Sequence, residues 1–209
     1  MARPRSAGFD SQRQQILVAA AQLFATRGYT ATTVQGVAAA CGISKATLYH
    51  YVSDKQGLLA QISTGHVARL EALVAQVSAQ GLPPEAHLRE LIHRFMQAYA
   101  GAQNEHRVLT EDVKFLALAD RESVHASQRR VVAAYADAVA ALRPELRAAG
   151  LHKPLTMLLF GMMNWTFTWL KAEGALRHET LAPMVVALLL GGLPAVPLTA
   201  TATATATGC

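Results

Sequence analysis

The sequence is poor in the residues that mark secreted, metal-binding or catalytic proteins. Only two of its 209 residues are cysteines, which argues against a disulfide framework or a zinc site and suits a reducing cytoplasm. The N-terminus has no early apolar run, so no signal peptide is expected. No phosphate-binding glycine loop and no pairing of a nucleophile with a base is visible, and the eight histidines are scattered. We therefore expect neither an enzyme nor a bound metal or cofactor.

Aromatic residues are also scarce. They make up 6% of the chain, although hydrophobic residues make up 52%, so alanine, leucine and valine supply most of the apolar surface. Alanine and leucine are strong helix formers, whereas aromatic and β-branched residues favour strands. The composition therefore predicts an all-α fold, and the spacing of apolar residues and helix breakers divides it into about nine helices.

Positive charge is concentrated towards the N-terminus. Residues 1–60 hold six lysines and arginines against two acidic residues, whereas the rest of the chain holds thirteen against twelve. A polyanionic partner would require such a local basic excess. A general solubility bias is the alternative, and the charge alone does not separate the two.

Two C-terminal segments, residues 154–170 and 181–198, carry no charge. The first is at the short limit for crossing a bilayer, and prolines and glycines interrupt the second. Buried helices of a bundle, or the seam of a dimer, account for both segments better than membrane spans do. We therefore expect no membrane association.

The most informative stretch of the chain is residues 32–59. Capping boxes at Thr32–Gln35 and Ser53–Gln56 are typical of helix starts, and Gly42 supplies a turn between two short helices. The second of these helices, residues 44–51, has an apolar side that can pack on the first. The contacts expected there join Ile43, Leu48 and Val52 to Val34, Val37 and Ala38.

This arrangement is how a helix-turn-helix sits on DNA. Small and polar side chains near the start of the second helix can reach base edges in the major groove. Flanking hydroxyls, cations and helix N-termini can hold phosphates. The residues expected to contact DNA are Thr32, Thr33, Ser44, Lys45, Thr47, Tyr49, His50, Tyr51 and Lys55. The alternative is an ordinary buried helix with capped ends.

The run from Gly42 to Tyr51, with Lys55 and Leu58-Leu59, strongly resembles the signature of the TetR family of repressors. The first helix of that family is matched by Ile16, Ala20, Leu23, Phe24, Gly28 and Tyr29. The resemblance implies a DNA-binding domain at residues 1–58 and a ligand-binding and dimerisation domain at 59–198. The low complexity of the alternating Thr-Ala tail at 199–209 predicts that the tail is disordered. It also implies a cytoplasmic regulator.

By this resemblance the protein is a homodimer on double-stranded operator DNA. Two recognition helices would enter successive major grooves of a palindrome, about 34 Å apart. The family's dimer interface uses its eighth and ninth helices, which correspond here to helices expected at residues 154–174 and 180–191. These contain the uncharged segments, so dimerisation would cover surface that a monomer would expose.

The C-terminal half is expected to bind a small-molecule effector. Residues 151–176 and 101–112 resemble repressors of phenylacetate degradation and their acyl-CoA-responsive relatives, which implies phenylacetyl-CoA or another acyl-CoA as the inducer. Such a ligand needs aromatic or thioether surface for the acyl group and cations for the phosphates. The residues expected to bind it are Phe95, Met96, Tyr99, Arg107, Phe115, Asn164 and Trp165, and further cations are Arg94, Arg129, Arg130 and Lys114. The alternatives are a plain core for the aromatic residues and a solvated face for the arginines.

A second function remains open at this point. Repressors of multidrug exporters bind lipophilic or cationic compounds and often place acidic residues in the pocket. Glu111, Asp112 and Asp120 could take that role here. The sequence identifies neither the effector nor the operator.

Overall fold

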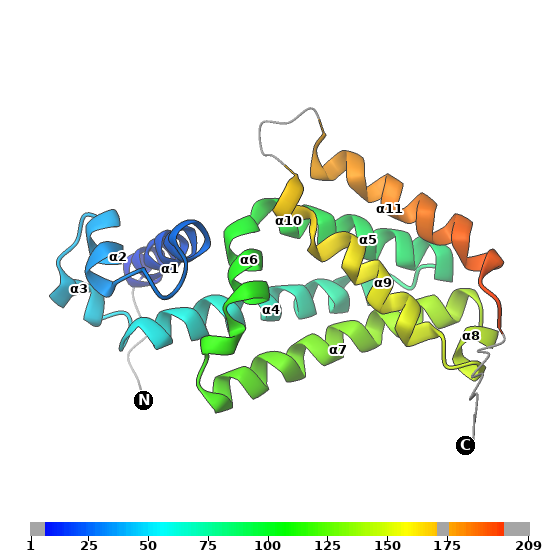
Figure 1. Cartoon of the computed structure of the whole chain (residues 1–209), viewed down its shortest axis with the longest axis horizontal. Helices are drawn as coiled ribbons and strands as arrows, with labels where there is room; N and C mark the ends of the chain where they lie inside the picture. Colours follow the sequence, from blue (N-terminus) through cyan, green and yellow to red (C-terminus); the bar gives the residue numbers. More distant parts are fainter. Residues whose placement is uncertain (1–6, 171–175, 199–209) are drawn as a thin grey trace, which may run out of the picture. The chain divides into compact units, whose positions relative to one another are not determined.

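A computed structural model of the chain describes residues 7–170 and 176–198, and all regular structure in them is helical (Figure 1). The predicted all-α fold is therefore confirmed. The basic arm before residue 7, Cys209 and the Thr-Ala tail lie outside the described residues.

The described part of the chain contains eleven α-helices and two short 3-10 helices, η1 and η2. The first four are α1 (Ala7–Arg27), α2 (Val34–Ala40), α3 (Lys45–Tyr49) and α4 (Lys55–Ser78). They are followed by α5 (Pro84–Gly101), α6 (Gln103–Glu111), η1 (Val113–Phe115), α7 (Leu118–Leu142) and α8 (Glu145–Ala148). The chain continues with α9 (His152–Asn164), α10 (Thr166–Trp169), α11 (His178–Gly192) and η2 (Leu193–Ala195).

The chain forms two compact units. The first comprises residues 1–73 and 98–130, and the second comprises residues 74–97 and 131–209. The packing therefore does not divide the chain at a single point, and α4, α5 and α7 each contribute to both units. A functional boundary after residue 58 stays a prediction.

The first unit has one continuous apolar core. Ile16 and Phe24 from α1, Leu48 from α3 and Leu58 from α4 are buried in the same cluster as Val108 from α6. α1 packs against both α2 and α6. The predicted packing of the second helix of the motif on the first is confirmed, because Leu48, Val52, Val37 and Ala38 are all buried in this cluster. The helix-turn-helix thus shares its core with α6.

The second unit is organised around a buried aromatic cluster. The ring of Phe95 lies 5.0 Å from that of Tyr135, and the Tyr135 ring lies 4.9 Å from that of Phe160. The Tyr135 hydroxyl donates a hydrogen bond to the carbonyl of Leu91. This bond satisfies the one polar atom that the tyrosine brings into the core.

Two long helical stretches of the chain are interrupted. α7 ends at Leu142, because Pro144 disfavours helical backbone at the residue before it and lacks an N–H. The helix expected over 154–174 is divided into α9 and α10. Near this break the hydroxyls of Thr166 and Thr168 donate to the carbonyls of Met163 and Trp165, three residues back. Such bonds compete with the helical hydrogen-bond pattern.

Both predicted capping boxes are off by one residue. Thr33, and not Thr32, is the N-cap of α2, and its side chain accepts a hydrogen bond from the N–H of Gly36. At the start of α4 the Asp54 carboxylate accepts from the N–H of Gly57 at 2.6 Å. An aspartate is as good an N-cap as a serine, so the sequence pattern did not distinguish Asp54 from its neighbour.

Within residues 7–170 and 176–198, no helix is both long enough and apolar enough to span a membrane.

Candidate functional site

The turn between α2 and α3 is built around Gly42. Its φ of +65° is a left-handed conformation that residues with a Cβ rarely adopt. Cys41 precedes it as the C-cap of α2. The Cys41 side chain is half-buried, and burial raises the pKa of its thiol, which therefore stays neutral. Cys41 thus serves the packing of the turn.

The start of α3 is ordered by two hydroxyl groups. Ser44 is the N-cap, and its Oγ accepts from the N–H of Thr47 at 3.0 Å. The two hydroxyl oxygens of Ser44 and Thr47 are also within hydrogen-bond distance, at 2.8 Å. These contacts hold two predicted DNA-contacting side chains in a fixed arrangement at the N-terminus of the recognition helix.

The outer face of α3 presents a cation beside an aromatic ring. Lys45 and Tyr49 are exposed, and the Lys45 ammonium lies 5.8 Å from the centre of the Tyr49 ring. His50, the C-cap of α3, is also exposed. Tyr51 is half-buried and stacks on Phe9 of α1, with ring centres 4.6 Å apart. This stacking partner was not foreseen from the sequence.

The two threonines before α2 differ in their environment. Thr33 is exposed at the helix N-terminus, where a phosphate could be held. Thr32 is buried, and its hydroxyl donates to the carbonyls of Leu23 and Gly28 at the end of α1. The Thr32 side chain therefore closes the α1–α2 loop and does not face a DNA partner, contrary to the expectation.

Lys55 also has a role that the sequence did not reveal. Its ammonium donates to the carbonyls of Tyr29, Thr30 and Thr32 at 2.9–3.2 Å and lies 4.4 Å from the centre of the Tyr29 ring. An ammonium group has three N–H donors, so all of them are used. The expectation that Lys55 is available to a phosphate does not hold in this conformation. The lysine ties the start of α4 to the loop before α2.

The predicted effector-binding residues are divided between the two units. Phe95 and Met96 are fully buried in the second unit, where Phe95 belongs to the aromatic cluster. Tyr99 is buried in the first unit and stacks on His106, with ring centres 3.8 Å apart. The structure thus favours the core role for Phe95 and Met96.

The remaining predicted effector-binding residues lie towards the surface. Arg107 forms an ion pair with Glu111 one helical turn away, and Phe115 stacks on Tyr29 in the first unit. Trp165 is 58% exposed, so it does not line an interior pocket in the single chain. Asn164 is half-buried at the end of α9, and its role stays a prediction.

Two of the additional cations that were expected to bind the coenzyme phosphates, Arg130 and Lys114, interact with other side chains of the protein. Arg130 is paired with Glu71, whose carboxyl pKa is lowered by hydrogen bonding to that guanidinium. Lys114 lies 5.3 Å from the centre of the Phe115 ring.

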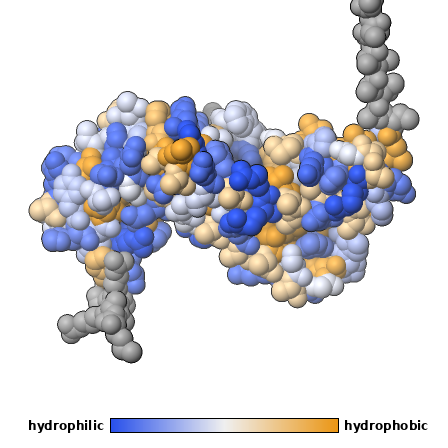
Figure 2. All heavy atoms as spheres, turned by 90° about the horizontal axis from the view of Figure 1, so that it is seen from below, coloured by the Kyte–Doolittle hydropathy of each residue, from blue (hydrophilic) through white to orange (hydrophobic). Residues whose placement is uncertain are grey.

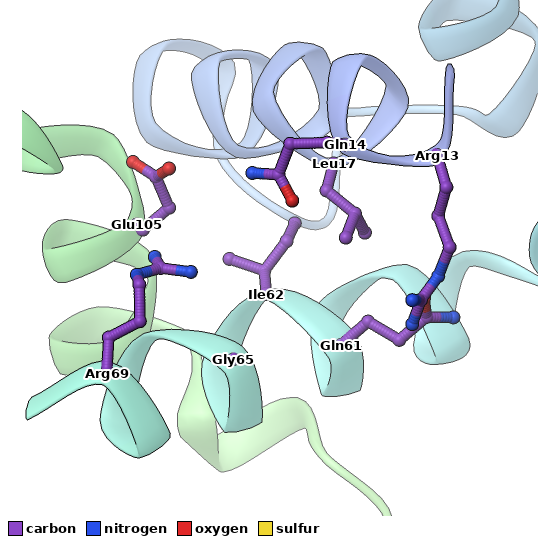
Figure 3. A pocket seen from close by; sticks show the side chains of 8 residues that line it. All are labelled: Arg13, Gln14, Leu17, Gln61, Ile62, Gly65, Arg69 and Glu105. Atoms are coloured by element: carbon purple, nitrogen blue, oxygen red, sulfur yellow. The ribbon is translucent and has the colours of Figure 1, made fainter. Parts of the chain in front are cut away.

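A cleft of about 160 Å³ opens in the first unit among α1, α4 and α6 (Figure 3). On one side the Arg13 guanidinium donates from Nε to the side-chain oxygen of Gln61 at 2.8 Å. On the other side Arg69 points towards Glu105 (Figure 3). These arginines come from different helices and form no motif, so the sequence did not reveal them.

A buried polar cluster in the same unit was also missed. It consists of Ser63 and His66 on α4, Tyr99 on α5 and His106 on α6, each at most 3% exposed. The sequence showed only scattered histidines, and their meeting depends on the packing of three helices. Across the described ranges, no group of three or more His, Cys, Asp or Glu side chains could hold a metal ion.

Comparisons with known proteins identify the class. Residues 16–62 match the family of bacterial regulatory proteins named after tetR, and residues 81–193 match the tetracyclin repressor-like C-terminal domain. The second match covers more than half of the chain. The protein is therefore a transcriptional regulator, and it belongs to the TetR family.

Individual relatives agree with this assignment. A TetR-family transcriptional regulator from Bordetella parapertussis 12822 has 35% sequence identity and a TM-score of 0.82, over 88% of this chain and 97% of that one. AibR in complex with isovaleryl coenzyme A and operator DNA has 26% identity and a TM-score of 0.72, over 85% and 97%. The repressor KstR2 of Rhodococcus jostii strain RHA1 is 31% identical over 116 residues, which span 56% of this chain and 57% of KstR2.

Proposed function

We propose that this protein is a homodimeric repressor that binds a palindromic operator and is released from it by an acyl-CoA, with phenylacetyl-CoA as the first candidate. The observation that carries the DNA-binding part is the outer face of α3. There Ser44 and Thr47 are ordered at the helix N-terminus, and Lys45 and Tyr49 are exposed. Such side chains can read base edges and hold phosphates.

The proposed dimer interface is the apolar outer face of α9, α10 and α11. This face is defined by six side chains that are each at least half exposed: Met157, Leu158, Trp165, Trp169, Met184 and Leu188. α9 packs against α11, so the exposed residues of these two helices belong to one packed helix pair. Figure 2 views the molecule from below Figure 1, and on that face apolar residues are scattered among hydrophilic ones. Large apolar side chains exposed together on packed helices are unusual on a monomer, and a second copy would cover them.

Two observations support an acyl-CoA effector. The related AibR has been crystallised with isovaleryl coenzyme A and operator DNA. In this chain, the cleft of the first unit holds Arg13 and Arg69, and guanidinium groups bind phosphates well. A repressor induced by lipophilic cations would rely on acidic side chains, and Glu105 is the one acidic residue among those that line this cleft, beside the two arginines.

The first experiment identifies the DNA. Full-length protein is used to select binding sequences from a random duplex pool, and binding is then measured by fluorescence anisotropy. We expect a palindrome that Lys45→Ala and Tyr49→Ala variants bind more weakly while remaining dimeric. Wild-type affinity in both variants would contradict the role of α3.

The second experiment identifies the effector class. Phenylacetyl-CoA, isovaleryl-CoA, free CoA and ethidium are each added to the protein–DNA complex, and the thermal stability of the free protein is measured in parallel. We expect the two thioesters to release the DNA and to raise Tm, and free CoA and ethidium to do neither. Release by ethidium alone would favour regulation of an exporter.

A further inference from the structure

The buried polar cluster of the first unit is held together by aromatic contacts and one hydrogen bond between imidazoles. Nε2 of His66 lies 3.3 Å from Nδ1 of His106, and the His106 ring stacks on Tyr99. Ser63 is three residues before His66 on α4, so the two side chains lie on the same side of that helix. All four residues come from the packing of α4, α5 and α6.

Oγ of Ser63 and Nδ1 of His66 are buried and have no hydrogen-bond partner among the described residues. Ser63 is fully buried, and His66 is 1% exposed. Each such atom costs about 1–3 kcal/mol of stability when nothing satisfies it. Two such atoms, three residues apart on α4, leave hydrogen-bonding capacity that a polar group from outside the chain can take up.

The chemistry of the cluster restricts that group. Burial, followed by the nearby charges of His106 and Arg69, lowers the pKa of His66 to about 3. The imidazole is therefore neutral at physiological pH, and the site does not favour a cation. The Ser63 hydroxyl can donate, and Nδ1 of His66 donates when His106 supplies the proton shared with Nε2. Two donors from neighbouring positions suit a carbonyl oxygen, which has two lone pairs.

We propose that Ser63 and His66 form a subsite for the carbonyl oxygen of the effector. This inference rests on the proposed function, because an acyl-CoA presents one thioester carbonyl. The subsite is in the same compact unit as the helix-turn-helix, and α6, which carries His106, packs against α1. Binding there fixes the protonation pattern of the His66–His106 pair in that unit.

The test compares two ligands that differ only at the carbonyl. Phenylacetyl-CoA and its thioether analogue, in which a methylene replaces the carbonyl, are titrated into full-length protein by calorimetry. We expect the wild type to bind the thioester about tenfold more tightly, which corresponds to two net hydrogen bonds. Ser63→Ala should remove most of this preference. The control Thr64→Val should keep it, because the Thr64 hydroxyl already donates to the carbonyl of Ala60.

A second pair of variants guards against misfolding. His66→Asn keeps an amide near the position of Nδ1, whereas His66→Gln extends its amide towards His106 and leaves the Nδ1 position empty. We expect the preference to persist in part in the first and to be lost in the second. Equal binding of the two ligands by the wild type, or an unchanged preference in Ser63→Ala, overturns the subsite but leaves the acyl-CoA proposal standing. Failure of both ligands to bind overturns the effector class and the subsite with it.

Discussion

At the scale of single residues, the same side-chain type has different roles depending on what surrounds it. Lys45 and Lys55 are ten positions apart, and both were expected to contact DNA. Lys45 is exposed on the outer face of α3, whereas the Lys55 ammonium is bound by three backbone carbonyls and a tyrosine ring. Lys45 is therefore available to DNA, and Lys55 mainly stabilises the loop.

Replacing these two lysines should separate the roles. Lys55→Met leaves three carbonyls without their charged donor, and we expect it to lower the free energy of unfolding by about 2–3 kcal/mol. Lys45→Met should change that free energy by less than about 0.5 kcal/mol. It should also reduce the slope of log K against log salt concentration for operator binding by about 1, as expected for the loss of one phosphate contact. Urea denaturation and anisotropy at several salt concentrations measure both quantities. Equal stability of the two variants would contradict the role given to Lys55.

The buried imidazole of His66 should make stability depend on pH. Its pKa is about 3 in the folded protein, against an ordinary value near 6.5 in the unfolded chain. Between these values the unfolded chain binds a proton that the folded protein does not, so stability falls as the pH drops below about 6.5. Above about pH 6.5 the imidazole of His66 is neutral in both the folded and the unfolded protein, so it does not lower the stability. We expect a loss of about 1–2 kcal/mol between pH 7 and pH 5.

The His66→Gln variant isolates this contribution, because other histidines titrate in the same range. Urea denaturation at pH 7 and pH 5 should show a smaller loss in the variant than in the wild type. Parallel losses in the two proteins would mean that His66 is not the group responsible.

At the scale of elements, the sequence pattern indicated which face of a helix is apolar but not what covers it. The uncharged segment after Pro154 was expected to lie in one helix over residues 154–174. It forms two helices whose inner side contains Leu159, Phe160 and Met163, while Leu158 and both tryptophans are exposed. Two apolar faces on one helix require two partners, and within residues 7–170 and 176–198 only the inner face is covered.

This exposed face gives a prediction about assembly. Leu158→Asp places a carboxylate in the proposed interface, where its burial would cost several kcal/mol, so we expect the variant to be monomeric. Leu118→Asp is the control, because Leu118 on α7 is 61% exposed, close to the 67% of Leu158, but lies outside the proposed face. Sedimentation velocity distinguishes the two states. A dimeric Leu158→Asp variant would place the interface elsewhere.

At the scale of the whole molecule, the chain packs as two compact units, and α4, α5 and α7 each contribute to both of them. The helix-turn-helix, α6 and the first part of α7 share one core. A change at α6 can therefore alter the packing of the helices that carry the DNA-contacting residues. Such a shared core is the physical coupling that a ligand-responsive regulator needs.

The sequence by itself determined the helical class, the helix-turn-helix and the two uncharged segments. These features are local, because helix propensity, a turn glycine and apolar spacing act within a few residues.

Only the tertiary structure decided which polar side chains remain free to contact a partner and which are engaged within the protein. Thr32 and Lys55 are engaged by backbone carbonyls of the α1–α2 region, and His66 meets His106 across forty positions of sequence. The tertiary structure also divided the predicted effector-binding residues between two units. The reason is that a sequence pattern indicates which side of a helix avoids water, whereas the identity of a neighbour depends on how whole helices pack.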